Sequence, residues 1–245
     1  MLIYESMIKN LQLVPNGTNA KLLLRHSIRP QDNDGNADFS LGLTREGKEF
    51  AKLFGKYLGG HLDKNFKVDI QKVKTSISPR CKETVEMILQ GYRKEIPIQE
   101  EKILHTMWIE NKEKWDKVFR DYDKKMKILL QKMLDGEYFD GVYPVNLSVA
   151  KMLQVMDFYD NTAKKQTDKK SLYRLDIFAT HDSLIMLLLA YLLGKNIAEF
   201  NEWIYMLEGC ILWLEEYKLY VVWRGDRYEI KLESSILELL NQKDI

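Results

Sequence analysis

KLLLRHSIRP, at residues 21–30, holds three consecutive leucines that run directly into Arg25 and His26. The turn-forming triplet Pro15-Asn16-Gly17 precedes it. Apolar residues in unbroken succession are typical of a strand that is buried on both faces of a sheet. We therefore predict a buried strand at Lys21–Arg25, with ionisable side chains at its carboxyl end.

The same order of strand, polar turn and helix recurs twice along the chain. A strand predicted at Val73–Ser78 ends in a serine that can cap a helix begun by Pro79, which places Arg80 in the first helical turn. A second strand, predicted at Leu175–Ala179, is followed by Thr-His-Asp at 180–182 and then by an apolar helix. Strands that alternate with helices favour the α/β class.

The segment between the first two strands is predicted to be a loop followed by a helix. Residues 31–40 are almost wholly polar, which is typical of a surface loop. Thr44 is a suitable N-cap, and apolar side chains then recur at helical spacing as far as Leu58. Gly59-Gly60 should end this helix, whose apolar face should pack on the sheet.

The middle of the chain has helical periodicity. One apolar stripe extends from Trp115 to Met133 and another from Val149 to Met156. We predict a single domain over residues 1–245 that contains a helical insertion at about 95–170, whose last ten residues form an exposed connection back to the core.

The C-terminal part is predicted to be a small antiparallel unit. Two β-rich runs, Cys210–Leu214 and Leu219–Trp223, flank a polar turn and indicate a hairpin. A third strand at Tyr228–Leu232 and a short helix at Ser235–Leu240 should follow.

Composition excludes several classes of protein. The chain has 245 residues, 45% of them hydrophobic, which is enough for a sizeable core. A net charge of +1 favours neither nucleic acid nor an anionic membrane as a partner. The longest apolar run, Leu184–Leu193, is about half of what a membrane-spanning helix needs. Two cysteines without a paired spacing and the lack of a secretory signal at residues 1–10 favour a cytoplasmic protein.

Ionisable side chains follow each of the three predicted strands of the core. They are Arg25, His26 and Arg29 after the first strand, Arg80 after the second, and His181 and Asp182 after the third. In α/β sheets the carboxyl ends of such strands meet in one crevice. Three guanidiniums and two imidazoles in a small volume repel one another unless an anion lies between them. Phosphate fits best, because guanidinium groups match its oxygens and a helix N-terminus adds N–H donors.

These residues also resemble a known family. The segment Arg25-His26-Ser27-Ile28-Arg29 resembles the R-H-x-x-R signature of the histidine phosphatase superfamily. Ser78-Pro79-Arg80, with Thr84 and Gly91, is similar to the second-arginine segment of that family, and His181-Asp182 resembles the His-Asp pair of its acid phosphatase branch. The order along the chain is the same. The resemblance implies a three-layer α/β/α fold with a mostly parallel central sheet, as in phosphoglycerate mutase-like proteins.

The resemblance also implies a reaction. His26 would be the nucleophile that forms a phosphohistidine, and neighbouring cations would keep it neutral by lowering its pKa. Asp182 would protonate the leaving group and then activate water. The groups that bind the phosphoryl oxygens would be Arg25, Arg29, Arg80 and His181. The substrate would be a small phosphomonoester, and no metal or other cofactor is expected.

Two departures from the family pattern leave the branch open. The acid phosphatase branch usually has glycine where Ser27 stands and one residue between the arginine and proline that are adjacent here as Arg29-Pro30. The mutase-like branch takes its acid from a glutamate, a role open to Glu100 or Glu101. We prefer Asp182 as the acid because it directly follows the predicted phosphate-binding histidine. The alternatives in function are a phosphomutase and a catalytically silent phosphate-binding module.

Each site residue also has a simple structural interpretation. Asp182 is a suitable N-cap for the apolar helix that follows it. His61 and His105 have no partners in the sequence and are expected on the surface or in the helical region. A zinc site built from the four histidines is disfavoured because no two of them have ligand spacing. The oligomeric state and the identity of the substrate stay open.

Overall fold

The computed structural model describes residues 3–30, 40–158, 170–215 and 218–242. The loop expected at 31–40 and the connection expected at the end of the helical insertion lie almost wholly outside these ranges.

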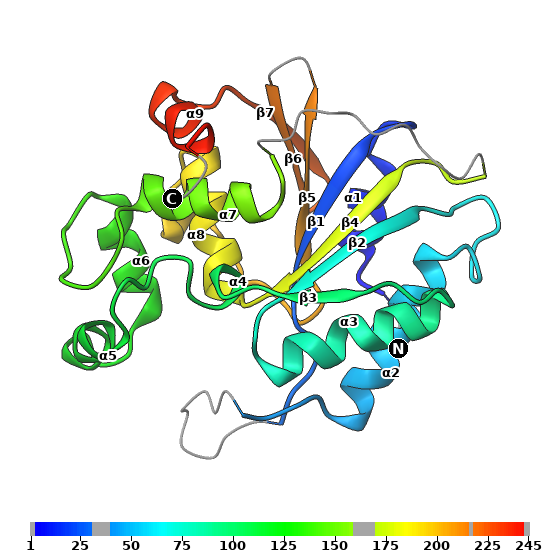
Figure 1. Cartoon of the computed structure of the whole chain (residues 1–245), viewed down its shortest axis with the longest axis horizontal. Coiled ribbons are helices and arrows are strands. Elements are labelled where there is room, and N and C mark those ends of the chain that lie inside the picture. The colour runs from blue at the N-terminus through cyan, green and yellow to red at the C-terminus, as the bar shows by residue number, and fades with distance from the viewer. Residues whose placement is uncertain (1–2, 31–39, 159–169, 216–217, 243–245) are drawn as a thin grey trace.

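A seven-stranded mixed sheet forms the centre of the molecule, in the order β3-β2-β4-β1-β5-β6-β7 (Figure 1). The strands are β1 (Asn19–Arg25), β2 (Asp69–Thr75), β3 (Ile98–Glu100), β4 (Arg174–Thr180), β5 (Gly209–Glu215), β6 (Lys218–Trp223) and β7 (Asp226–Ile230). The first four in spatial order are parallel, and each later pairing is antiparallel. Because β6 is antiparallel to β5, it shares the direction of β1, so the sheet is mostly parallel.

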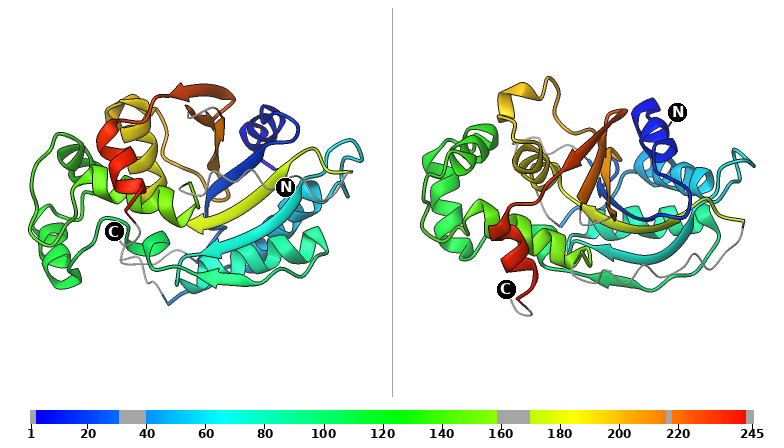
Figure 2. Two further views of the ribbon diagram at one scale, coloured as in Figure 1. Left: turned by 45° about the horizontal axis from the view of Figure 1, so that its top comes forward. Right: turned by 90° about the horizontal axis from the view of Figure 1, so that it is seen from above.

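Helices cover both faces of the sheet, which gives three layers (Figures 1 and 2). One face packs on α1 (Glu5–Gln12), α2 (Arg45–Leu58) and α3 (Pro79–Tyr92). The other face packs on α4 (Ile103–Thr106) and α8 (Asp182–Leu193). The same apolar core also includes α5 (Lys112–Asp121), α6 (Met126–Leu134), α7 (Val145–Val155) and α9 (Ser234–Leu240), with a short 3-10 turn at Ile197–Glu199. The three-layer α/β/α fold expected from the sequence is confirmed.

The three leucines of β1 show why the sequence builds this arrangement. Leu22 and Leu24 belong to the core under α2 and α3, whereas Leu23 belongs to the core under α7 and α8. All three are fully buried. A central parallel strand loses both faces to the core and therefore has apolar residues in succession rather than alternation.

The predicted helix starts are confirmed at two places. The Thr44 hydroxyl accepts the N–H of Gly47 at 3.0 Å and caps α2. Pro79 is the first residue of α3, after Ser78 in extended conformation. The Ser78 side chain makes no capping hydrogen bond, so the fixed φ of proline is the stronger start signal here.

The middle of the chain differs from the prediction in two respects. The predicted stripe from Trp115 to Met133 is not one helix, because Asp123 and Lys124 adopt positive φ values of 51° and 58° and separate α5 from α6. The helical segment also begins at Ile103 rather than near residue 95, because Ile98–Glu100 pairs with β2 as an edge strand. β3 escapes prediction because it is short and mostly exposed, without an apolar run.

The apolar run at 184–193 forms most of α8, which lies buried between the sheet and the neighbouring helices. Within the described ranges, no helix combines the length and the apolar character that crossing a bilayer requires.

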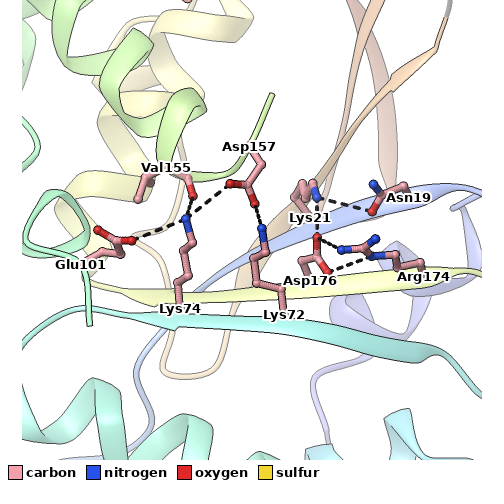
Figure 3. Close-up of polar contacts among 9 residues, drawn as sticks. All are labelled: Asn19, Lys21, Lys72, Lys74, Glu101, Val155, Asp157, Arg174 and Asp176. Atoms are coloured by element: carbon pink, nitrogen blue, oxygen red, sulfur yellow. Dashed lines mark hydrogen bonds and ion pairs between the residues drawn. The ribbon is translucent and has the colours of Figure 1, made fainter. Parts of the chain in front are cut away.

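The amino ends of the parallel strands carry charge on the face toward α7 (Figure 3). Asp176 on β4 is fully buried, and its carboxylate accepts Lys21 Nζ at 2.5 Å and Arg174 Nε at 3.2 Å. Two cations around one buried carboxylate offset the cost of taking it out of water. The Lys21–Asp176 pair joins β1 to β4 across the sheet.

A second ionic cluster joins β2 to the helical segment (Figure 3). Asp157, which follows α7, pairs with Lys72 at 2.5 Å and with Lys74 at 3.5 Å. Lys74 Nζ also donates to the carbonyl of Val155 at 2.9 Å and lies 3.5 Å from Glu101 Oε1. Lys74 therefore holds both ends of the segment 101–157 against the sheet.

Close contact between α2 and α3 depends on two glycines. A Cβ at Gly55 would lie 1.9 Å from the carbonyl oxygen of Ile88, and one at Gly91 would lie 2.0 Å from that of Lys52. Gly91→Ala should therefore push the helices apart and lower the free energy of unfolding by about 1–3 kcal/mol, measured by urea denaturation. Gln90→Ala, at an exposed position of α3, is the control and should change it by less than about 0.5 kcal/mol. Equal stability of the two variants would contradict this account of the helix contact.

Candidate active site

The carboxyl ends of β1, β4 and β2 lie side by side and level with one another. Arg25 is opposite Thr180, and Thr75 is opposite Ala179. The backbone pairing continues one residue beyond the strands, since the N–H of His26 donates to the Thr180 carbonyl at 3.0 Å. The three turns that carry the predicted site residues therefore meet at one edge of the sheet.

His26 is buried, with only 3% of its surface exposed, and its ring orientation is set locally. Nδ1 lies 2.8 Å from the carbonyl oxygen of Ser27, which can only accept, so the proton is on Nδ1. Nε2 accepts a hydrogen bond from Nε of Arg80 at 3.1 Å and is therefore unprotonated. The lone pair of Nε2 thus faces a guanidinium.

Burial is the main reason why His26 stays neutral. It lowers the pKa of His26 to about 3, the Ser27 carbonyl opposes this shift, and Arg80, Arg25 and Arg29 add to it. The sequence-based explanation, which named neighbouring cations as the cause, needs correction because burial has the larger effect.

Arg80 joins the two central histidines. Its side chain is almost fully buried and extends from the first turn of α3. Besides the contact with His26, its Nη2 lies 3.4 Å from Nδ1 of His181. Burial also lowers the pKa of His181 well below its usual value, and the positive charges nearby add to that effect. One guanidinium therefore touches two neutral imidazoles.

Arg25 and Asp182 form an ion pair beside this cluster. Nη2 of Arg25 lies 2.9 Å from Oδ2 of Asp182, and Nη1 donates to the carbonyl of Ile204 at 2.5 Å. The interpretation of Asp182 as an N-cap is wrong, because His181 is the cap residue and Asp182 is the first residue of α8. Its Oδ1 accepts the N–H of Ser183 at 2.8 Å, while Oδ2 stays on the Arg25 side.

Arg29 lies at the rim. Its Nη1 donates to the carbonyl of Pro30 at 3.0 Å in an exposed position. Its charge is among the causes that lower the pKa of Arg25 and of Arg80, so it lies within electrostatic reach of both. Arg29 adds positive potential beside Arg25 and Arg80.

The two glutamates considered as alternative acids are both held by lysines. Glu100 Oε1 lies 2.8 Å from Nζ of Lys82, with nearly half of the glutamate side chain exposed. Glu101 lies 3.5 Å from Lys74 in the ionic cluster described above. Both carboxylates are thus engaged by cations outside the group formed by His26, Arg80 and His181.

Two hydroxyl groups support the loop that follows β1. The Thr84 hydroxyl accepts the N–H of Ser27 at 2.9 Å and donates to the Arg80 carbonyl at 2.6 Å. The Ser27 hydroxyl donates to the Gly47 carbonyl at 2.8 Å. These bonds connect the loop to α3 and to α2 and so fix the position of His26 relative to Arg80.

His105 was not predicted as a site residue. It lies in the helical region, as expected, but its Nδ1 is 3.1 Å from Nε2 of His181 and 3.0 Å from the Ser76 hydroxyl. No spacing in the sequence indicates this contact, because α4 reaches the site from the helical segment that resembles nothing recognisable. Ser76 was missed because the sequence placed it inside the predicted strand Val73–Ser78, whereas β2 ends at Thr75.

In the part of the chain that the structure describes, no three His, Cys, Asp or Glu side chains form a group that could hold a metal ion. The residues gathered at this edge of the sheet are cationic or neutral around His26, and an anion such as phosphate fits their charge.

The buried histidines predict how stability depends on pH. The pKa of His26 is about 3 in the folded protein, and about 6.5 is expected in the unfolded chain. The unfolded chain therefore binds the proton more readily, and the stabilisation present above about pH 6.5 is lost as pH falls toward 3. The free energy of unfolding should fall by up to about 1.4 kcal/mol per pH unit for this one residue.

Urea denaturation between about pH 4 and 7 tests this expectation. His26→Asn should have a shallower acid dependence than the wild type, whereas His61→Asn, at an exposed position, should follow the wild type. Parallel profiles of His26→Asn and the wild type would show that His26 titrates normally.

No family model and no curated protein matches this sequence. Solved structures do match its fold. A mycobacterial glucosyl-3-phosphoglycerate phosphatase is 13% identical, with a TM-score of 0.56 over 85% of this chain and 100% of that one. YhfR of Bacillus stearothermophilus is 16% identical, with a TM-score of 0.54 over 89% and 99%. A putative alpha-ribazole-5'-P phosphatase of Escherichia coli is 15% identical, with a TM-score of 0.51 over 89% and 97%. Each of these likenesses covers between 85% and 89% of this chain and concerns the fold.

Proposed function

We propose that this protein is a metal-independent phosphatase of the histidine phosphatase superfamily, which hydrolyses small phosphomonoesters through a phosphohistidine on His26. The observation that carries the proposal is the unprotonated Nε2 of buried His26, which faces the Arg80 guanidinium at the carboxyl edge of the sheet. A neutral nucleophile beside a cation suits attack on an anionic phosphoryl group.

In the first step Nε2 of His26 attacks phosphorus in line with the ester oxygen. The P–N bond forms, the P–O bond breaks, and the leaving alcohol takes a proton from Asp182. In the second step Asp182 removes a proton from water, whose oxygen attacks phosphorus. The P–N bond then breaks, phosphate leaves, and His26 is neutral again.

Positive charge around His26 stabilises the phosphoryl group during transfer. The groups that bind its oxygens are Arg25, Arg29, Arg80 and His181. Arg80 already touches both histidines, so a phosphoryl group on His26 would lie directly against its guanidinium. Charge stabilisation by protein groups alone makes a metal ion unnecessary in this mechanism.

The ion pair with Arg25 places Asp182 beside the phosphoryl site, because Oδ2 of Asp182 lies 2.9 Å from Nη2 of Arg25. A phosphoryl dianion would compete for the same guanidinium and leave the carboxyl group of Asp182 available to the leaving group. The engagement of Glu100 and Glu101 by lysines favours Asp182, and with it the acid phosphatase branch.

The likeness to solved structures supports the fold that the proposal needs, and two of the three matched proteins carry phosphatase in their names. The substrates named for those proteins are not carried over. At 13–16% identity the leaving-group side of the site is free to differ.

The test is phosphate release from p-nitrophenyl phosphate and from a panel of metabolite phosphates, with a chelator present, from about pH 4 to 8. We expect turnover without metal, and acid-labile ³²P on the protein after rapid quenching. The best panel member would begin to define the substrate. If folded protein releases no phosphate but exchanges it between positions of one substrate, it is a mutase. If it only binds inorganic phosphate, it is a phosphate-binding module.

A further inference from the structure

Three polar atoms meet behind His181, on the side away from His26. Nε2 of His181 lies 3.1 Å from the Ser76 hydroxyl and 3.1 Å from Nδ1 of His105, and these two are 3.0 Å apart. His181 and Ser76 are buried, and His105 is partly buried. The function proposed above uses His181 but assigns nothing to the two groups behind it.

Hydrogen-bond accounting determines which of these atoms carry protons. Arg80 can only donate, so its Nη2 donates to Nδ1 of His181, and neutral His181 then carries its proton on Nε2. That proton points at Ser76 and His105. Nδ1 of His105 must therefore be an acceptor, because a proton there would oppose the one on His181 across 3.1 Å.

The Ser76 hydroxyl completes the network. It accepts the backbone N–H of Ser78 at 3.2 Å, and its own proton can go to the sulfur of Cys81, with which it is hydrogen-bonded, so the single lone pair of Nδ1 of His105 is left for His181. Its remaining lone pair is available to Nε2–H of His181. Two acceptors thus hold the rear proton of His181 in place.

We propose, on the basis of the function proposed above, that His105 is a positioning residue which accepts the Nε2 proton of His181 and thereby directs Nδ1 of His181 at the phosphoryl group. When phosphate takes over the Arg80 guanidinium, Nδ1 of His181 loses that donor. With Nε2 already protonated, His181 can then bind the phosphoryl oxygen only through a proton at Nδ1. The proton comes from the monoanionic form of the phosphoryl group, which becomes the dianion, so His181 pairs with the phosphoryl group as an imidazolium.

The fold holds His105 where this role requires it. The Thr180 hydroxyl, adjacent to His181, donates to the carbonyl of Leu104 at 2.6 Å, and Leu104 is fully buried. Glu101, just before α4, lies 3.5 Å from Lys74, which anchors the same end of the helical segment to β2 (Figure 3). Two links just before His105 in the chain thus restrict its movement relative to His181.

Nitrogen-15 NMR of histidine-labelled protein, with and without inorganic phosphate, tests the proposal. In the wild type we expect Nε2 of His181 to be protonated and Nδ1 of His105 to be unprotonated, and phosphate to add a proton at Nδ1 of His181. The four histidines are assigned by single substitutions. The opposite protonation of His181 or of His105 in the wild type would overturn the proposal without any variant.

Two variants separate positioning from packing. His105→Phe keeps a ring of similar size but removes the acceptor, and we expect kcat to fall by roughly 10- to 100-fold and phosphate to bind more weakly. His105→Asn keeps an acceptor near the place of Nδ1 and should restore most of kcat and the NMR signature of His181. His61→Phe, the same change at an exposed histidine outside the site, should behave as the wild type.

Failure of this proposal can be told apart from failure of the proposed function. A wild type that turns over while His105→Phe matches it in kcat, phosphate affinity and His181 protonation would overturn the role of His105 alone. A wild type that does not turn over would contradict the phosphatase function. The protonation of His181 and phosphate binding would then still decide whether His105 positions it.

Discussion

His26→Ala is expected to lower phosphate release from every substrate by roughly 10³-fold or more and to abolish covalent ³²P labelling. The imidazole supplies the lone pair that forms the bond to phosphorus. Its unprotonated Nε2 lies 3.1 Å from Nε of Arg80. The cationic side chains around the site are unchanged in this variant. Inorganic phosphate should therefore still bind, with an affinity within about tenfold of the wild type measured by calorimetry.

His61→Ala is the matched control, since it removes an imidazole at an exposed position and should leave turnover unchanged. Far-UV circular dichroism verifies that both variants fold. Labelling that persists in folded His26→Ala would place the phosphoryl group on another residue, and His105 and His181 would be examined next.

Asp182→Asn is expected to separate substrates by their leaving groups. Alkyl phosphates need a proton on the departing oxygen, so kcat on them should fall by roughly 10²- to 10⁴-fold. A nitrophenolate leaves without a proton, so the first step with p-nitrophenyl phosphate should persist. Because the same carboxylate activates water in the second step, phosphohistidine should accumulate and give a burst of nitrophenol in stopped-flow measurements.

Glu100→Gln and Glu101→Gln are the comparison variants. Their carboxylates face Lys82 and Lys74, and we expect neither variant to change the dependence on leaving group. A leaving-group effect that appears in one of them and is absent from Asp182→Asn would move the acid to that glutamate. It would also favour the mutase-like branch over the acid phosphatase branch.

The sequence by itself was enough for the fold class and for bringing most of the site together. β1, β2 and β4 are adjacent parallel strands, each buried and each followed by a polar turn, so their carboxyl ends meet by geometry alone. His26, Arg80 and His181 therefore come into contact once the strands are located. Each is the first ionisable residue after its strand, so its position in space follows from where that strand ends.

Local pattern was not enough in the helical segment. The apolar spacing from Trp115 to Met133 continues across Asp123 and Lys124, although these two residues have left-handed backbone conformations that end one helix before the next begins. The spacing of apolar residues indicates which side chains are buried, but it does not indicate whether they lie on one continuous helix. β3 went unrecognised because an edge strand of three residues, two of them exposed, has no periodic signal.

Only the tertiary structure decided the electrostatics of the site and the place of His105. Arginine and histidine positions can be found in a sequence, but burial cannot, and burial is the largest cause of the lowered pKa of His26. His105 and His181 are 76 positions apart and come within 3.1 Å because a buried leucine and a threonine hydroxyl bring α4 to β4. A contact of that kind follows from packing between elements, which no local pattern of residues records.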